Sequence, residues 1–376
     1  MKKILFRKLL FDCLKFFFLT IISISLIVWV FQAVNYLDIM VEDGRNYVVY
    51  FNYTILNFPK IISKILPFAV FLSFYYVLIK YESNNELIIF WNFGISKIQV
   101  INFFLKFSLM ILFLQIIFAS LIVPKSQDLA RSILKNSDIN FFDNFLKPKK
   151  FNDIIKGVTI YSESKDENGL LKNIYIKKIT NQKEFEITYA KRGEIKTFGT
   201  NQVLVLFDGE NIKGKKDNLN SFSFSKSDFN LTNLDSNTIT HKKTQQNSTI
   251  DLFQCYKNLT DKNFKGEITD IENCRQENKS NILAELYKRL IIPFYLPILI
   301  LISLLSILTN KEDMNYFKNK IYIFLIGLFI IIFSETTLRF VKDNLVENIK
   351  LLSIPFLILI ILYSIIGYKL NSKIKI

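Results

Sequence analysis

Three features of this sequence could carry chemistry: a glycine- and lysine-containing segment, a histidine and three cysteines. The first is a near match to a nucleotide-binding loop. Residues 209–216 read GENIKGKK, close to the phosphate-binding pattern G-x-x-x-x-G-K-[S/T]. Lys216 stands where a Ser or Thr must bind magnesium, strand-like residues precede the segment, and no helical pattern follows it. We interpret the segment as a glycine-containing hairpin turn, and we expect this chain to bind no cofactor.

Histidine and cysteine, the other two features, are scarce. His241 is the only histidine, so a histidine-based triad or metal cluster has almost no material. The three cysteines form no C-x-x-C pair, so we expect no structural zinc site. Cys255 and Cys274 lie in one polar segment, where they form either a disulfide or two free thiols, and Cys13 is expected to be reduced. We therefore do not expect an enzyme.

The composition indicates a membrane protein. Half of the 376 residues are hydrophobic, and the formal net charge is +15. The lysines are dispersed, which favours contact with lipid headgroups over nucleic-acid binding. Six apolar stretches are candidate spans, with Pro124 as the expected stop of the third. They lie at about 16–37, 56–79, 98–123, 290–310, 321–334 and 351–368. Six spans place both ends on one side, and the lysine-rich ends indicate the cytoplasm.

Between the third and fourth spans the hydrophobic pattern changes to period two. FEITYA (185–190) is one such alternating segment, and DENG, KRGE and DGENIKG are turn signals. We expect an antiparallel all-β domain, jelly-roll-like, inserted on the outer side. The predicted fold is an α-helical membrane protein with three spans in residues 1–124, the β domain in 125–283 and three spans in 284–376.

The segment SNNELIIFWNFGIS (83–96) lies between the second and third spans and is too short to cross a bilayer. Ser83 and Glu86 form a capping-box pattern and Gly94 is a stop signal, so we predict a cytoplasmic helix at about 83–94. One face carries Leu87, Phe90, Trp91 and Gly94, and another carries Ile88, Ile89 and Asn92. Physical chemistry leaves two readings open, a helix resting on lipid or a helix that fits a groove on a cytoplasmic partner.

NNELIIFWNFGIS resembles the segment SELxxxRAxGxS of the LptF/LptG (YjgP/YjgQ) permease family. NILAELYKRLIIPFYLPILIL (281–301) is similar to that family's entry into the fourth span, and GVTIYSES and LKNIYI are similar to its strands. The resemblance covers essentially the whole chain, including the order of three spans, an outer domain and three spans.

The resemblance implies an LptF-like permease subunit of an ABC transporter in the bacterial inner membrane, which extracts lipopolysaccharide and passes it to a periplasmic bridge. The implied partners are an LptG-like permease, two LptB-like ATPases that bind ATP and magnesium, and LptC-like and LptA-like jelly rolls. The short helix would be the coupling helix, contacting the ATPase through Glu86, Leu87, Phe90, Trp91 and Gly94. Trp91 stands where the family has an arginine, so we expect an aromatic plug there.

Basic residues near the outer ends of the spans are candidates for contact with lipid phosphates. They are Arg45, Lys60, Lys64, Arg289 and Arg339. The alternative for Arg289 is positioning of the fourth span, and for Arg339 an ion pair with Glu335.

Three other functions remain as alternatives. The first is the LptG paralogue of the same complex, the second a membrane sensor with a ligand-binding β domain, and the third an enzyme acting on lipid-linked sugar. A sensor would need a cytoplasmic output domain and such an enzyme would need paired acids or a histidine at the membrane surface, and the sequence offers little of either.

Overall fold

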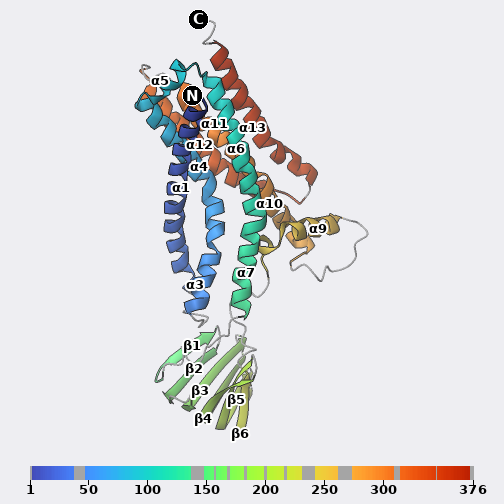
Figure 1. Ribbon diagram of the computed structural model, residues 1–376. Coiled ribbons are helices and arrows are strands. Elements are labelled where there is room, and N and C mark those ends of the chain that lie inside the picture. The colour runs from blue at the N-terminus through green and yellow to red at the C-terminus, as the bar shows by residue number, and fades with distance from the viewer. Residues whose placement is uncertain are drawn as a thin grey trace. The chain divides into compact units, whose positions relative to one another are not determined.

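The computed structural model describes residues 2–37, 47–136, 148–155, 158–166, 170–181, 184–198, 201–215, 218–230, 242–260, 273–308, 314–343 and 345–372 (Figure 1). The chain packs as two units. One, made of residues 1–31, 56–130 and 241–376, is helical, and the other, made of residues 32–55 and 131–240, carries the sheet. Residues 241–283, which we assigned to the β domain, belong to the helical unit.

Six helical segments in the described residues are long and apolar enough to cross a membrane, which confirms the six predicted spans. The first three comprise α1 (Lys2–Asn35), α3 and α4 (Tyr47–Leu56, Phe58–Ser83), and α6 and α7 (Lys97–Ile117, Val123–Asn136). The last three comprise α10 and α11 (Lys279–Leu290, Tyr295–Leu304), α12 (Tyr316–Thr337) and α13 (Leu345–Ser372). Two shorter helices are α5 (Glu86–Asn92) and α9 (Thr249–Thr260).

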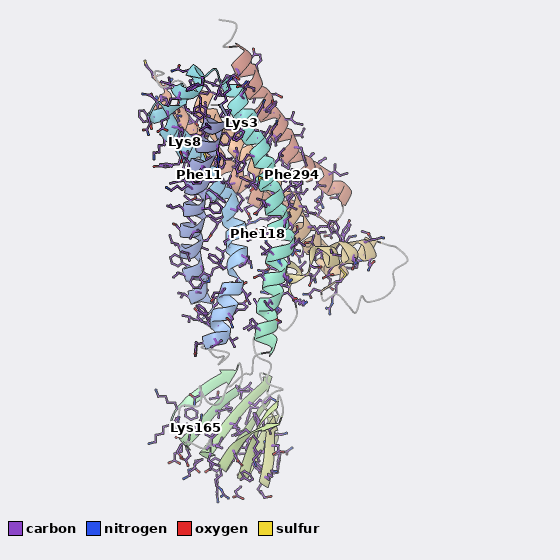
Figure 2. The ribbon with its side chains drawn as sticks, viewed as in Figure 1. Lys3, Lys8, Phe11, Phe118, Lys165 and Phe294 are labelled. Carbon is purple, nitrogen blue, oxygen red and sulfur yellow. A yellow bond between two sulfur atoms is a disulfide. The ribbon has the colours of Figure 1, made fainter. Side chains whose placement is uncertain are left out.

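The start of α1, the helix α5 and the end of α13 lie at the same end of the helical unit (Figure 1). The Lys2 Nζ donates a hydrogen bond to the Gly94 carbonyl at 3.0 Å, which fixes α1 beside the end of α5. Lys3 and Lys8 also extend from this end of α1 (Figure 2). Both ends of the described chain therefore lie on one side of the spans, as an even number of crossings requires.

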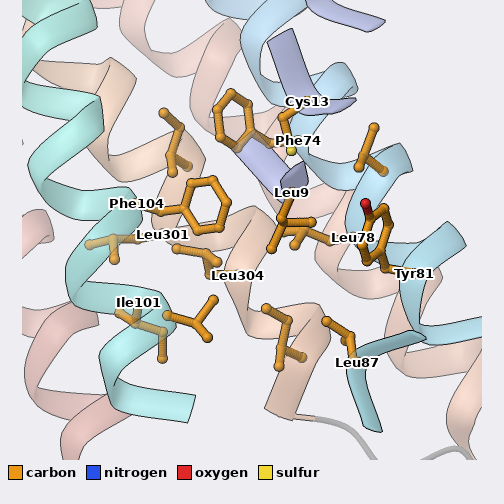
Figure 3. Packing of buried hydrophobic residues seen from close by; sticks show 14 of the residues in the cluster. Leu9, Cys13, Phe74, Leu78, Tyr81, Leu87, Ile101, Phe104, Leu301 and Leu304 are labelled. Atoms are coloured by element: carbon orange, nitrogen blue, oxygen red, sulfur yellow. The ribbon is translucent and has the colours of Figure 1, made fainter. Parts of the chain in front are cut away.

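Helix α11 is the centre of the helical unit. All ten of its residues are buried, and it packs against α4, α6, α12 and α13. Figure 3 shows part of the surrounding core, where Leu301 and Leu304 meet Phe104 of α6 and Leu9 of α1. Because lipid tails are as apolar as these side chains, close packing and interhelical hydrogen bonds hold such helices together. A hydrogen bond of 2.9 Å between Thr20 and Ser73 hydroxyls serves this purpose between α1 and α4.

Two proline residues within the spans, Pro67 and Pro355, each remove one backbone hydrogen bond, and a side chain from another helix bonds the carbonyl left open. Pro67 lacks the N–H that would reach the Ser63 carbonyl, and Gln115 Nε2 of α6 donates to that oxygen at 3.0 Å. Pro355 likewise frees the Leu351 carbonyl, to which the Tyr287 hydroxyl donates at 3.3 Å. Freed carbonyls inside a bilayer need such partners because no water is available.

The expectation that Pro124 ends the third span is wrong. The helix passes through a π-helical turn at Phe118–Ile122 and continues as α7. The carbonyl that Pro124 leaves without its helical donor is that of Ser120, and Thr249 Oγ1 donates to it at 2.7 Å. Proline normally stops a helix because its ring clashes with the carbonyl four residues earlier and because it has no N–H to donate. Here the wider π-helical turn relieves the clash, and Thr249 supplies the missing donor.

The other unit contains an antiparallel sheet of six strands, which confirms the inserted all-β domain. The strands are β1 (Phe151–Ile155), β2 (Val158–Lys165), β3 (Leu170–Asn181), β4 (Glu184–Phe198), β5 (Asn201–Lys215) and β6 (Asn218–Asn230). They pair in chain order, without the crossing connections of a Greek key, so the described strands do not by themselves establish a jelly roll. Alternate residues such as Ile160, Ile174 and Leu206 form its buried core.

Two of the predicted turns are strand interiors. KRGE lies within β4, and residues 209–215 of the GENIKGKK segment lie within β5. A Cβ added at Gly209 would come within 2.5 Å of the Phe224 ring and 2.2 Å of the Tyr189 carbonyl oxygen. Glycine here makes room for an aromatic ring lying on the sheet rather than reversing the chain. The near match to a nucleotide loop is therefore part of an extended strand.

Candidate functional site

The helix α5 starts differently from the prediction. Ser83 is the last residue of α4, and its hydroxyl donates back to the Lys80 carbonyl at 2.9 Å. Asn85, in the left-handed conformation with φ of 60°, is the N-cap, and no side chain caps the helix there. The capping box is therefore wrong, because Ser83 is used by the preceding helix. Glu86 is the first residue of α5, and Asn84 Nδ2 donates to its Oε1 at 3.2 Å.

The end of α5 is a Schellman motif built on Gly94. The Gly94 N–H donates to the Trp91 carbonyl at 2.9 Å, and the Ile95 N–H donates to the Phe90 carbonyl at 3.0 Å. Gly94 has a φ of 65°, the left-handed geometry that glycine adopts without strain. Ile95 and Phe90 are both buried in the same core, the apolar contact that accompanies this motif. The predicted stop residue thus ends the helix.

The two faces of α5 are used in the opposite way from the prediction. Leu87 and Phe90 were assigned to ATPase contact, but they are only 4% and 2% exposed and pack into the core of the helical unit. The exposed apolar side chains are Ile88, Ile89 and Phe93, at 50%, 46% and 42%. Leu87 and Phe90, three residues apart, lie on the one side of α5 that faces the helical core. A surface of three apolar side chains, Ile88, Ile89 and Phe93, remains outside, and we call it the α5 face.

Trp91 is half-buried at the border between these two faces. Its ring lies 6.5 Å from the Phe90 ring, and Lys97 Nζ lies 5.7 Å from its centre. The ammonium group of Lys97 is therefore held over the indole face of Trp91.

Several spans fix α5 in place. Leu9 and Leu78 share its core (Figure 3), and Lys97 Nζ donates to the Ile307 carbonyl at 2.9 Å, at the end of the fourth span. Four residues before α5, Glu82 forms an ion pair with Lys320 of α12, and Lys320 Nζ also donates to the Ser306 carbonyl at 3.1 Å. The core of α5 is therefore shared with α1, α4 and α11, and the end of α4 next to α5 is joined to α12.

A second group of residues, the lysine cluster, gathers around the other end of α4. It consists of Lys60 and of three lysines whose charges act on it, Lys64, Lys243 and Lys288, and the charge of Glu285 acts on Lys60 as well. Glu285 also forms an ion pair with Lys288 at 3.6 Å. Gln127, with its amide turned to satisfy both ends, accepts from Lys60 Nζ at 3.2 Å and donates to the Gln245 carbonyl at 3.2 Å. Since α4 has 26 residues, this cluster lies about 40 Å from α5 along the helix.

The remaining predicted basic residues have other positions. Arg289 is 2% exposed, and its guanidinium donates to Glu285 Oε1, the Asn247 and Gln245 carbonyls and Thr249 Oγ1, each at 3.0 Å. It therefore ties residues 245–249 to α10 and is not available to a lipid phosphate. Arg339 is exposed in the turn that follows α12. Arg45 lies outside the described residues.

Lys243 and Lys288 are members of the cluster that sequence reasoning did not assign to it. They are more than 180 residues from Lys60 in the chain, so no local spacing could have revealed the grouping. A cluster of four ammonium groups suits a ligand that carries several negative charges, such as a phosphorylated headgroup.

Cys255 and Cys274 are joined by a disulfide in the structure, with Cα atoms 5.8 Å apart. The bond packs α9 against α10, beside Leu252, Ile282 and Leu286. Cys13 is buried within α1. Among the described residues, no group of three or more His, Cys, Asp and Glu side chains is placed to hold a metal ion.

Comparison with known proteins adds two findings. The family model described as lipopolysaccharide export system permease LptF/LptG matches residues 7–369. The chain is also similar to "Uncharacterized protein RP871" of Rickettsia prowazekii (strain Madrid E), with 24% identity over 276 residues that cover 73% of each chain.

Proposed function

Because the chain belongs to the LptF/LptG family of lipopolysaccharide export permeases, we propose that it is the LptF-like membrane subunit of an exporter driven by a separate ATPase. The family makes it a multi-pass membrane protein and a permease component of a lipopolysaccharide export complex. We assign it to the bacterial inner membrane with both termini in the cytoplasm, because both ends of the sequence are rich in lysine and the start of α1 and the end of α13 lie on the side of α5. The sheet then lies in the periplasm.

The observation that carries this proposal is the division of α5 into a buried edge and an exposed apolar face. An interfacial helix needs only to rest on lipid, but α5 is clamped through Leu87 and Phe90, closed by the Gly94 motif and bonded to α1 through Lys2. A short rigid helix with an apolar face suits docking into a groove on a partner. We assign the α5 face and Glu86 to an LptB-like ATPase, which would bind the ATP and magnesium.

The lysine cluster supplies the opposite end of the proposed pathway. Lys60 and Lys64 stand near the start of α4 and Lys288 stands in α10, so we assign them to the outer ends of the second and fourth spans, where they would hold the phosphates of lipopolysaccharide by charge. The acyl chains need only apolar walls, such as the exposed side chains of α1 and α12. An LptG-like permease would complete the cavity, and LptC-like and LptA-like jelly rolls would continue the path from the sheet.

Capture of the ATPase by the purified complex tests the proposal. Ile89→Asp places a charge on the α5 face and removes apolar contact of about 1.5–3 kcal/mol, so ATPase capture should fall at least about tenfold. Ile4→Asp is the matched control, since Ile4 is 70% exposed at the same end of the helical unit but lies on α1. Glu86→Ala should also weaken capture. Equal capture by the Ile89 variant and the control, with both chains folded, would sink the docking assignment.

Which second permease purifies with this chain decides between the LptF-like and LptG-like roles. A sensor would purify without any ATPase, so the same preparation separates that function as well.

A further inference from the structure

An apolar cavity lies in the helical unit, apart from both α5 and the lysine cluster. It has a volume of about 150 Å³ and is bounded by three parts of the chain. Phe253 and Tyr256 come from α9, Leu283 and Leu286 from α10, and Leu352 from α13. The cavity is partly open, and an enclosed cavity of about this volume lined by Leu, Ile and Phe side chains accepts a ligand the size of benzene.

Two polar side chains at the cavity wall, Tyr287 and Asn348, are already engaged. The Tyr287 hydroxyl donates to the Leu351 carbonyl that Pro355 leaves open. The Asn348 amide accepts from the Lys342 N–H at 2.9 Å and donates to the Lys342 carbonyl at 2.8 Å. Water entering the cavity would find these two side chains already bonded and the rest of the lining mostly apolar, so an apolar occupant is favoured.

The surroundings of the cavity are those of a membrane boundary. Leu352 stands in the first turns of the sixth span, and Leu290, also at the wall, precedes the buried part of the fourth. On α9, Leu252 and Cys255 face α10, whereas Ile250 and Phe253 are 66% and 50% exposed. A short amphipathic helix with such exposed apolar side chains, next to the starts of two spans, suits the lipid interface.

A cation marks the rim of the cavity. Lys279 Nζ lies 5.6 Å from the centre of the Tyr256 ring, which itself forms part of the wall. An ammonium group beside an apolar cavity complements an anionic lipid, whose chain enters the cavity while its phosphate stays near the lysine.

From these observations we propose that the cavity between α9, α10 and α13 binds one acyl chain of an anionic membrane lipid. The site holds roughly six carbons of chain, judged from the benzene-sized precedent. The chain comes either from a phospholipid or from a lipid A anchor, which present the same chemistry to the cavity. The Cys255–Cys274 disulfide holds α9 over α10 and so maintains one wall of the site.

Photolabelling of the whole chain in lipid nanodiscs tests the proposal. The probe is a phosphatidylglycerol with a diazirine near the end of one acyl chain, and mass spectrometry locates the adducts. Adducts are expected on residues 253–256 and 283–290. Leu283→Trp fills the cavity, and since losing burial of two methylene groups costs about tenfold in affinity, these adducts should fall at least that much. Leu290→Trp, at a half-buried position of the wall, is a second variant should Leu283→Trp fail to fold.

Controls and competitors separate the possible outcomes. Ile250→Trp lies on the exposed side of α9, outside the cavity, and should leave the adducts unchanged. If excess unlabelled lipopolysaccharide competes with the probe, the cavity also accepts an acyl chain of lipid A. If it does not compete, the bound acyl chain comes from a phospholipid. Adducts on these residues no stronger than those on exposed Phe329 of α12, and insensitive to Leu283→Trp, would overturn the proposal, because they would show contact with bulk lipid only. So would protection of the cavity by a protein partner with no lipid adduct. Neither result depends on whether the chain exports lipopolysaccharide.

Discussion

Glu82 at the end of α4 and Lys320 near the start of α12 form an ion pair inside the helical unit, with their side chains only 11% and 7% exposed. Lys320 Nζ lies 4.9 Å from the Tyr316 ring and also donates to the Ser306 carbonyl. The pair joins the second, fourth and fifth spans at the point where α5 begins.

Removing one partner of this ion pair should lower the free energy of unfolding much more than removing both. Lys320→Met leaves the Glu82 carboxylate buried without its charge partner, which costs about 3–5 kcal/mol. The double variant Glu82→Gln with Lys320→Met leaves no uncompensated charge and should regain most of that loss. Thermal unfolding of the four proteins of this cycle in detergent measures the coupling. Additive losses would show that the two side chains act independently.

Gly94→Ala should loosen α5 without any steric clash. No atom lies within 4 Å of the position of an added Cβ, so the cost is the left-handed backbone alone, about 1–2 kcal/mol. Hydrogen exchange of residues 86–95 should become faster, and ATPase capture should weaken with it. Gly367→Ala is the matched control, because that position is also open but its helical backbone suits alanine. Unchanged exchange at α5 would mean that the Gly94 motif does not hold the helix.

Neighbouring residues Lys288 and Arg289 should give opposite results. Arg289→Gln strips donors from the Asn247 and Gln245 carbonyls, so it should destabilise the packing of residues 245–249 by about 1–3 kcal/mol. Lys288→Gln should leave stability nearly unchanged but weaken binding of lipopolysaccharide, with a smaller effect on a dephosphorylated form. Thermal unfolding and lipid binding, measured on both variants, check this division. The reverse pattern would place Arg289 in the binding site.

The sheet should lose stability in acid through Glu186. Partial burial raises the pKa of this carboxyl, but hydrogen bonds from Asn211 at 2.9 Å and Lys213 at 3.1 Å outweigh it and hold the pKa below the ordinary 4.5. The stabilising contribution is therefore complete above about pH 4.5 and is lost as the pH falls through the lowered value. Denaturation at several pH values, read by a hydrogen-exchange pulse at one common pH on β4 and β5, should show this loss. Glu186→Gln should remove it, and an equal acid effect in that variant would assign the loss to other groups.

Hydropathy predicted the spans because every residue of a span is kept away from water, by lipid or by protein. Period-two alternation predicted the inserted sheet because alternate residues of its strands are buried. Local signals failed where a distant residue changes their meaning. Pro124 does not end its helix, because Thr249 supplies the missing donor. Gly209 does not turn the chain, because Phe224 needs the space. At α5 the helix and its Gly94 stop were predictable, but which face is buried depends on where the ends of α1 and α4 lie.

The donors that serve the prolines carry a consequence for how this sequence can change. Gln115 Nε2, Tyr287 Oη and Thr249 Oγ1 each complete a helix to which they do not belong. Each proline and its distant donor therefore depend on one another, so we expect them to change together in evolution. Loss of Gln115 leaves a carbonyl without a donor in the second span, although Gln115 itself lies in the third. Replacing Pro67 with alanine restores the backbone donor and makes Gln115 dispensable. Among relatives of this chain, the two members of each pair should appear and disappear together.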